Sequence, residues 1–215
     1  MHARATALAA VAVLAAGTAL RAHALDEYVQ ATRVDVCSKG VVLFADLTPG
    51  VAIAQVIVDR LDSDHDGVFS PAEAEAYGRA LLEDLDLSLD GAPLSLSLIR
   101  VEAPTVGEIR QGQGTIRIET WSDAPARPGR HRLVLRNSHL PGISVYLANA
   151  LVPDSREVHI IEQTRDARQQ TFQLDFDAVG DHTGMPFAWL LTGAAVVVSL
   201  VGLRTSGKGG FQRHA

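Results

Sequence analysis

Residues 62–73 read Asp-Ser-Asp-His-Asp-Gly-Val-Phe-Ser-Pro-Ala-Glu, a spacing that could coordinate a divalent cation. Asp62, Asp64 and Asp66 occupy the first, third and fifth positions, so three short carboxylates can converge on one point. Gly67 at the sixth position permits a sharp turn, and Glu73 at the twelfth is long enough to reach back with both oxygens. Calcium takes about six to eight oxygen ligands, and a loop of this composition provides them.

Two further residues complete the predicted set of ligands. Val68 at the seventh position would contribute its backbone carbonyl, and Ser70 at the ninth would bind through a water molecule. Phe69, between them, would anchor the loop to an apolar core. The sequence therefore predicts one Ca²⁺ site whose ligands are Asp62, Asp64, Asp66, Val68, Ser70 and Glu73.

The segments on both sides of this loop have helical patterns. Before it, apolar residues recur at helical spacing and predict an entering helix: Val51, Ile53, Ala54, Val56, Ile57 and Leu61. After it, Ser70-Pro71-Ala72-Glu73 has the composition of a helix start, with Ser70 as N-cap and Glu73 as its capping-box partner. Glu73 thus has two predicted roles, one in the helix cap and one at the ion.

A helix–loop–helix with these ligands resembles the EF-hand calcium-binding family over residues 51–83. The resemblance implies calcium binding; a plain solvated turn and a degenerate hand without useful affinity are the alternatives. Residues 86–97 superficially repeat the pattern but end in Ser97, and their alternating leucines predict a β-hairpin around Asp90-Gly91. The only methionines are Met1 and Met185, so the hand has no Met-rich groove, and we expect the calcium to be structural or weakly modulatory.

Around the hand the pattern is β throughout, with short strands separated by turn residues. The predicted strands are residues 28–37, 41–47, 85–89, 94–101, 115–121, 130–136, 144–151, 157–164 and 170–176. We expect a mainly β fold, an antiparallel β-sandwich with one EF-hand inserted at residues 49–84, between the second and third strands. Residues 107–114 are rich in glycine and are expected to form a loop.

Both ends of the chain are hydrophobic, and they predict different things. Residues 1–24 contain an apolar run followed by Ala22-His23-Ala24, which is typical of a signal peptide; an uncleaved anchor is the alternative. Residues 185–203 lack charge and would extend about 28 Å as a helix, enough to cross a bilayer; a buried core helix is the alternative. Basic residues follow this segment, so residues 204–215 are expected in the cytoplasm and the domain of residues 25–182 outside it.

The composition of the external part argues against several classes of function. Residues 25–184 hold 14 Lys and Arg against 25 Asp and Glu, a formal charge of −11, which disfavours nucleic-acid binding. Cys37 is the only cysteine, so the domain has no internal disulfide; we expect Cys37 to be a half-buried strand residue, and intermolecular pairing is the alternative. Because the histidines lack zinc-site spacing and no nucleophile or nucleotide motif occurs, we do not expect an enzyme.

Two short sequence segments carry a second resemblance. Leu25-Asp26-Glu27-Tyr28 and residues 143–151, Ile-Ser-Val-Tyr-Leu-Ala-Asn-Ala-Leu, are similar to bacterial exported regions that precede HupE/UreJ-type membrane proteins, which are associated with nickel or other metal transport. With one predicted spanning helix, this chain would be at most a partner or regulator of a transporter. The sequence predicts a calcium-binding, single-pass, membrane-anchored extracytoplasmic protein; an accessory subunit of a membrane transport or envelope complex is the alternative.

Overall fold

The computed structural model describes residues 26–154 and 156–179. The predicted signal peptide (residues 1–24), transmembrane helix (185–203) and cytoplasmic tail (204–215) lie outside the described residues, as do the last residues of the predicted domain. Within the described ranges, every helix is too short or too polar to cross a bilayer.

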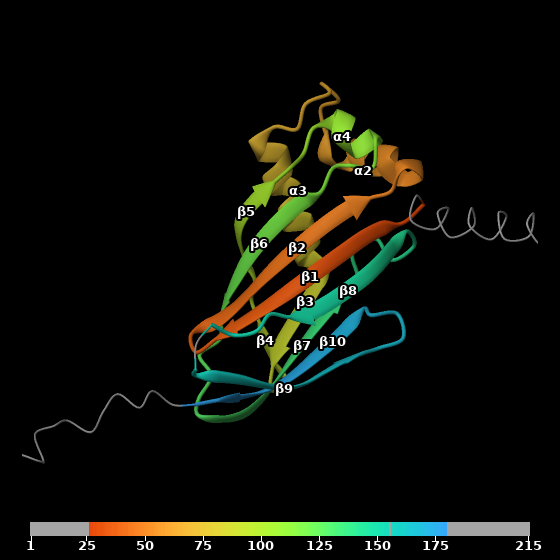
Figure 1. The fold of residues 1–215 in the computed structure, drawn as a ribbon. Coiled ribbons are helices and arrows are strands. Elements are labelled where there is room, and N and C mark those ends of the chain that lie inside the picture. Colours follow the sequence, from red (N-terminus) through yellow and green to blue (C-terminus); the bar gives the residue numbers. More distant parts are fainter. Residues whose placement is uncertain (1–25, 155, 180–215) are drawn as a thin grey trace, which may run out of the picture. The chain divides into compact units, whose positions relative to one another are not determined.

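The described residues are mainly β and form two five-stranded sheets with a few short helices, as the strand pattern predicts (Figure 1). The first sheet has the order β5-β6-β2-β1-β8, made of Ser97–Glu102, Ile116–Asp123, Gly40–Pro49, Tyr28–Cys37 and Ser144–Ala150. The second has the order β4-β3-β7-β10-β9, made of Ala92–Leu94, Leu85–Leu89, Gly129–Asn137, Thr171–Ala178 and Val158–Arg165.

Alternation along the strands builds one hydrophobic core from both sheets. In β2 every second side chain is buried, including Leu43 and Leu47, and in β10 the same period buries Phe172 and Leu174. These residues belong to a single cluster that also contains Leu61 of the helix before the acidic loop. Cys37 ends β1 and is half-buried, as expected, and its thiol lies 3.4 Å from the carbonyl oxygen of Gly40.

One strand pairing differs from the predicted antiparallel arrangement. β1 pairs with β8 in parallel, with Tyr28 opposite Ser144 and Val34 opposite Ala150. The other strand pairs of the described chain are antiparallel. A parallel pair needs a long connection, and here most of the domain lies between the two strands. Alternation of side chains is the same in both kinds of pair, so the pattern cannot report strand direction.

The predicted strand at residues 94–101 is also wrong, because the structure divides it between the two sheets. Ala92–Leu94 (β4) completes a hairpin with β3, and Ser97–Glu102 (β5) begins the first sheet. The leucines alternate without interruption across this passage, which hid the change of sheet. The hairpin itself is confirmed, with Asp90 and Gly91 at φ values of 53° and 82° in its turn.

The helix–loop–helix lies where the chain passes from the first sheet to the second, between β2 and β3 as predicted (Figure 1). A 3-10 turn at Val51–Ile53 precedes α2 (Ala54–Leu61), and α3 spans Pro71–Glu83. In α2 the residues at helical spacing, Ala54, Ile57, Val58 and Leu61, are buried, so core packing holds a helix rich in β-branched residues. Val51 and Val56 are instead exposed.

A short helix, α4 (Val106–Arg110), lies where a loop was expected. Thr105 and Glu108 form a capping box there: the Thr105 amide donates to Glu108 at 2.7 Å, and the Glu108 amide donates to the Thr105 hydroxyl at 3.2 Å. The Thr-x-x-Glu signature was present in the sequence, and the neighbouring glycines masked it.

Candidate metal centre

The acidic loop between α2 and α3 brings three predicted ligands together. Asp62 is the C-cap of α2, and Asp64 and Asp66 follow in the turn. One carboxylate oxygen from each of the three lies within 4.8 Å of the others. This group could therefore hold a metal ion, and the first three predicted ligands are placed for it.

The backbone of the loop is bent by two residues with positive φ. Gly67 has φ 84°, the conformation for which a glycine was expected at the sixth position, and His65 has φ 60°. Each Asp side chain also accepts one backbone N–H: Asp62 from Gly67 at 3.0 Å, Asp64 from Asp66 at 3.1 Å and Asp66 from Val68 at 2.8 Å. A carboxylate has about four lone-pair sites, so these bonds leave oxygen capacity for an ion.

Asp62 has a carboxylate oxygen that the protein leaves unsatisfied. The residue is only 4% exposed, and its Oδ1 is buried with no hydrogen-bond partner among the described residues. A buried charged oxygen without a partner is costly, and a cation is the partner that fits an oxygen flanked by two further carboxylates. The donor set present, all oxygen, suits a hard ion of the calcium type.

Glu73 uses its carboxylate in the capping box and reaches across the loop. Its Oε2 accepts from the amide and hydroxyl of Ser70 at 2.9 and 2.8 Å, and its Oε1 accepts from the amide and hydroxyl of Ser63 at 2.6 and 3.0 Å. The predicted capping role is thus confirmed, with the Glu73 amide 3.3 Å from the Ser70 hydroxyl. Because Ser63 directly follows Asp62, the Glu73 carboxylate lies beside the acidic group, although it is not part of it.

The remaining predicted residues have mixed surroundings. The side chain of Val68 is exposed and apolar, so only its backbone carbonyl has an oxygen to offer an ion. Ser70 is the N-cap of α3. Phe69 packs against the hydrophobic core and anchors the loop as expected. Their roles as ligands, and that of Glu73, remain predictions.

The hydrogen bonds from Ser70, and then those from Ser63, lower the pKa of Glu73 from 4.5 to about 2. A group whose pKa is lower in the folded state stabilises the fold above its unfolded pKa, and this contribution disappears as the pH falls through the folded value. We therefore expect Glu73→Gln to destabilise the calcium-free protein at about pH 5, with a difference from wild type that shrinks towards about pH 2.

Urea unfolding at several pH values, in chelator, measures this difference. Glu75→Gln is the matched control, because Glu75 lies on the same helix and is exposed beside Arg79. That variant should follow wild type throughout. A Glu73→Gln deficit that stays constant down to about pH 2 would contradict the assigned role of the carboxylate.

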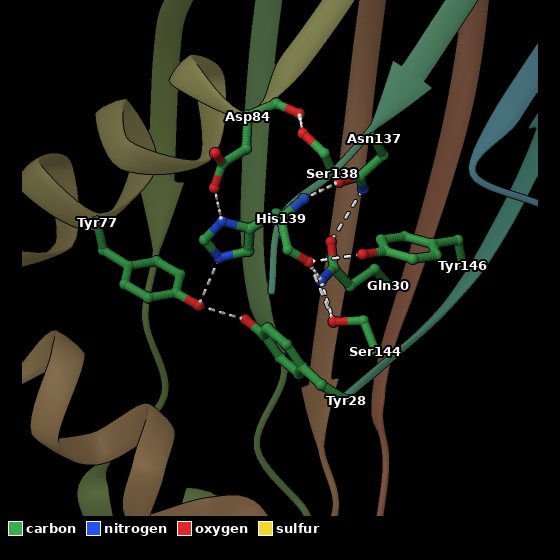
Figure 2. Close-up of polar contacts among 9 residues, drawn as sticks. All are labelled: Tyr28, Gln30, Tyr77, Asp84, Asn137, Ser138, His139, Ser144 and Tyr146. Carbon is green, nitrogen blue, oxygen red and sulfur yellow. Dashed lines mark hydrogen bonds and ion pairs between the residues drawn. The ribbon is translucent and has the colours of Figure 1, made fainter. Parts of the chain in front are cut away.

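A polar network at the other end of α3 was not foreseen from the sequence (Figure 2). His139, in the segment between β7 and β8, lies with its Nδ1 2.7 Å from Asp84, the C-cap of α3. Its Nε2 is 3.3 Å from the Tyr77 hydroxyl of α3, which is 2.7 Å from the Tyr28 hydroxyl of β1. Tyr28, Tyr77 and His139 are all at most 4% exposed.

The backbone of His139 is held as tightly as its ring. Its carbonyl accepts from Gln30, Tyr146 and Ser144 at 2.8, 2.8 and 3.1 Å, and its amide donates to Asn137 at 2.9 Å. Gln30 in turn accepts from the Asn137 amide at 2.9 Å. The sequence held one signal for this network, since Gln30 and Asn137 stand at positions where the two-residue period places buried side chains.

Burial shifts the titration of the network. It lowers the pKa of His139 below 6.5 against the opposing effect of Asp84, and Arg60 acts in the same direction as burial. Burial also raises the pKa of Tyr77 to about 12 and that of Tyr28 well above 10. The ring of His139 is therefore held in its neutral form near neutral pH.

The functional assignment of this protein depends on its own residues. A scan against protein-family models matched none, and a search of curated proteins found no similar sequence.

Proposed function

We propose that this chain is a calcium-binding protein with one site in the loop of residues 62–73. The observation that carries this proposal is the buried, unpartnered Oδ1 of Asp62 beside the carboxylates of Asp64 and Asp66. A dication relieves the repulsion among these groups and satisfies the orphaned oxygen. The proposed ligands are Asp62, Asp64, Asp66, the Val68 carbonyl, Ser70 through water, and Glu73.

The surroundings of the helices favour a structural or weakly modulatory ion. α2 follows β2 after a single 3-10 turn, and only Asp84 lies between the end of α3 at Glu83 and the start of β3. Gly78 brings α3 so close to β5 that a Cβ there would lie 2.6 Å from Cγ2 of Val101. A helix pair whose two outer ends are tied to strands has little room to open, unlike the helices of sensor hands.

The proposal also includes the cellular location of the domain. The charge-free segment of residues 185–203 and the basic residues after it support a single C-terminal span, with residues 25–182 outside the cytoplasm and a signal peptide at residues 1–24. Calcium is abundant outside cells, where such loops work with dissociation constants of about 10⁻⁴ to 10⁻³ M. The proposed role is binding and not catalysis.

Calorimetric titration of the full chain with calcium chloride, in mild detergent, tests this function. We expect one site, and at a hundredfold excess over the dissociation constant a stabilisation of about 2.7 kcal/mol. Glu73→Gln should bind far more weakly, because a carboxylate that can use both oxygens becomes a neutral amide. Glu75→Gln, on the exposed side of the same helix, should bind as wild type does. Identical melting curves in calcium and in chelator would exclude a structural ion.

A further inference from the structure

Helix α3 connects the acidic loop to the network around His139. Its first turn carries Ser70 and Glu73, which bond to each other and to the loop. One turn later Tyr77 projects towards the His139 ring, and at the end of the helix Asp84 accepts from it (Figure 2). The acidic loop and the His139 network are therefore attached to the same helix.

The hydrogen bonds of the network have a defined direction when His139 is neutral. A carboxylate only accepts, so the ring proton is on Nδ1 and points to Asp84. The bare Nε2 then accepts from the hydroxyl of Tyr77, 3.3 Å away. The Tyr77 oxygen is left to accept from the hydroxyl of Tyr28, at 2.7 Å. In this arrangement the hydroxyl protons of Tyr77 and Tyr28 both have an acceptor.

Protonation of His139 reverses that direction. Nε2 becomes a donor, so Tyr77 must accept from it and turn its own proton towards Tyr28. The hydroxyl proton of Tyr28 then has no acceptor, since Tyr77 is its one hydrogen-bond partner among the described residues and the side chain is fully buried. An orphaned buried donor is costly, and the strain falls on the contact between α3 and β1.

Of the charges near His139, Asp84 favours the imidazolium, whereas Arg60 disfavours it, as a cation in the loop would. The groups that face His139 are Asp84 and Tyr77 of α3, Tyr28 of β1, Tyr146 of β8 and Arg60 of α2. Arg60, two residues before Asp62, already disfavours the imidazolium. A dication bound between Asp62, Asp64 and Asp66 adds positive charge next to the end of α2 that carries Arg60 and so disfavours the imidazolium further.

We propose, on the basis of the calcium site proposed above, that protonation of His139 weakens cation binding in the loop of residues 62–73, so that the affinity of the site falls as the pH drops below neutral. Coupling between two sites is reciprocal: if the ion disfavours the imidazolium, the imidazolium disfavours the ion by the same factor. His139 thus acts as a regulatory group at a distance and not as a ligand.

The first test follows the imidazole of His139 by NMR in the full chain, with calcium chloride and with chelator. The His139 signal is identified by its loss in His139→Gln, whose amide can still donate to Asp84 and accept from Tyr77. A fivefold coupling would move the titration midpoint of His139 down by about 0.7 of a pH unit when calcium is bound. This measurement needs no variant to bind calcium.

The second test measures calcium affinity between about pH 7.5 and about pH 5.5, a range in which histidines change charge and ordinary carboxylates do not. Wild type should lose affinity as His139 becomes protonated, approaching about fivefold only when protonation is complete, and His139→Gln should lose little. His65→Asn is the matched control, because His65 lies within the loop itself and Asn tolerates its positive φ of 60°. This variant should keep the pH dependence of wild type.

The outcomes separate the two proposals. If calcium binds but leaves the His139 midpoint unchanged, or if His65→Asn removes the pH dependence, the coupling through His139 is wrong and the calcium site stands. If no calcium binds at about pH 7.5, both are wrong.

Discussion

Asp62→Asn is expected to weaken calcium binding by roughly a hundredfold, because affinity in such loops follows the number of charged ligands. Asp62 is the buried member of the acidic group, and the oxygen it would offer to the ion has no other partner among the described residues. An amide at this position retains an oxygen for the Gly67 amide, which lies 3.0 Å from Oδ2. The loop should therefore keep its shape and lose its ion.

Without calcium, Asp62→Asn should not lower the stability of the protein. Because Oδ1 of Asp62 is buried without a partner, removing the charge leaves the calcium-free protein as stable as wild type or more stable. Melting temperatures of both proteins, in chelator and in excess calcium, measure the two effects together. Asp59→Asn is the matched control, since Asp59 is an exposed carboxylate of α2 whose one hydrogen-bond partner within the described ranges is Gln55. An Asp62→Asn protein that binds calcium as tightly as wild type would exclude the site.

Gln30→Met is expected to destabilise the domain by about 2–3 kcal/mol, although the two side chains are similar in size. Gln30 is fully buried and bonds to the His139 carbonyl at 2.8 Å, to Ser144 at 2.7 Å and to Asn137 at 2.9 Å. The substitution leaves the buried amide nitrogen of Asn137 without its acceptor. A polar group orphaned in the core costs its full desolvation, which the added apolar surface does not offset.

Urea unfolding of the calcium-free protein measures this loss. Gln173→Met is the control, because Gln173 lies on the partly exposed side of β10 and its side chain makes no hydrogen bond within the described residues. It should stay within about 0.5 kcal/mol of wild type. Equal losses in the two variants would mean that the Gln30 network contributes little to stability.

The sequence predicted well those features that depend on residues close together along the chain. The acidic loop is twelve consecutive residues, so its spacing already implied that Asp62, Asp64 and Asp66 converge, and the structure places them within 4.8 Å. The capping box at Ser70 and Glu73 and the hairpin at Asp90-Gly91 likewise depend on neighbours along the chain. The insertion of the helices between β2 and β3 followed from the order of these local patterns.

Direction and assignment to a sheet were decided only by the tertiary structure. Side-chain alternation has the same period in parallel and antiparallel pairs, so the parallel pairing of β1 with β8 left no mark in the sequence. The division of residues 94–101 between two sheets is invisible for the same reason, because Leu94, Leu96 and Leu98 keep one period across the break. The alternation of residues at the two ends of this segment is the same, so the sequence does not show that the ends pair with strands of different sheets.

The sequence by itself determined the acidic loop, its two helices and the mainly β setting, because each depends on residues a few positions apart. Only the tertiary structure could join Tyr28, Tyr77, Asp84 and His139, which come from β1, α3 and the β7–β8 connection. Tyr28 and His139 are over a hundred residues apart, and their rings approach because β1 and the β7–β8 connection both contact α3 through Tyr77. The spacing of residues along a chain does not predict such a long-range contact, because the contact arises from the packing of whole elements and not from a local pattern.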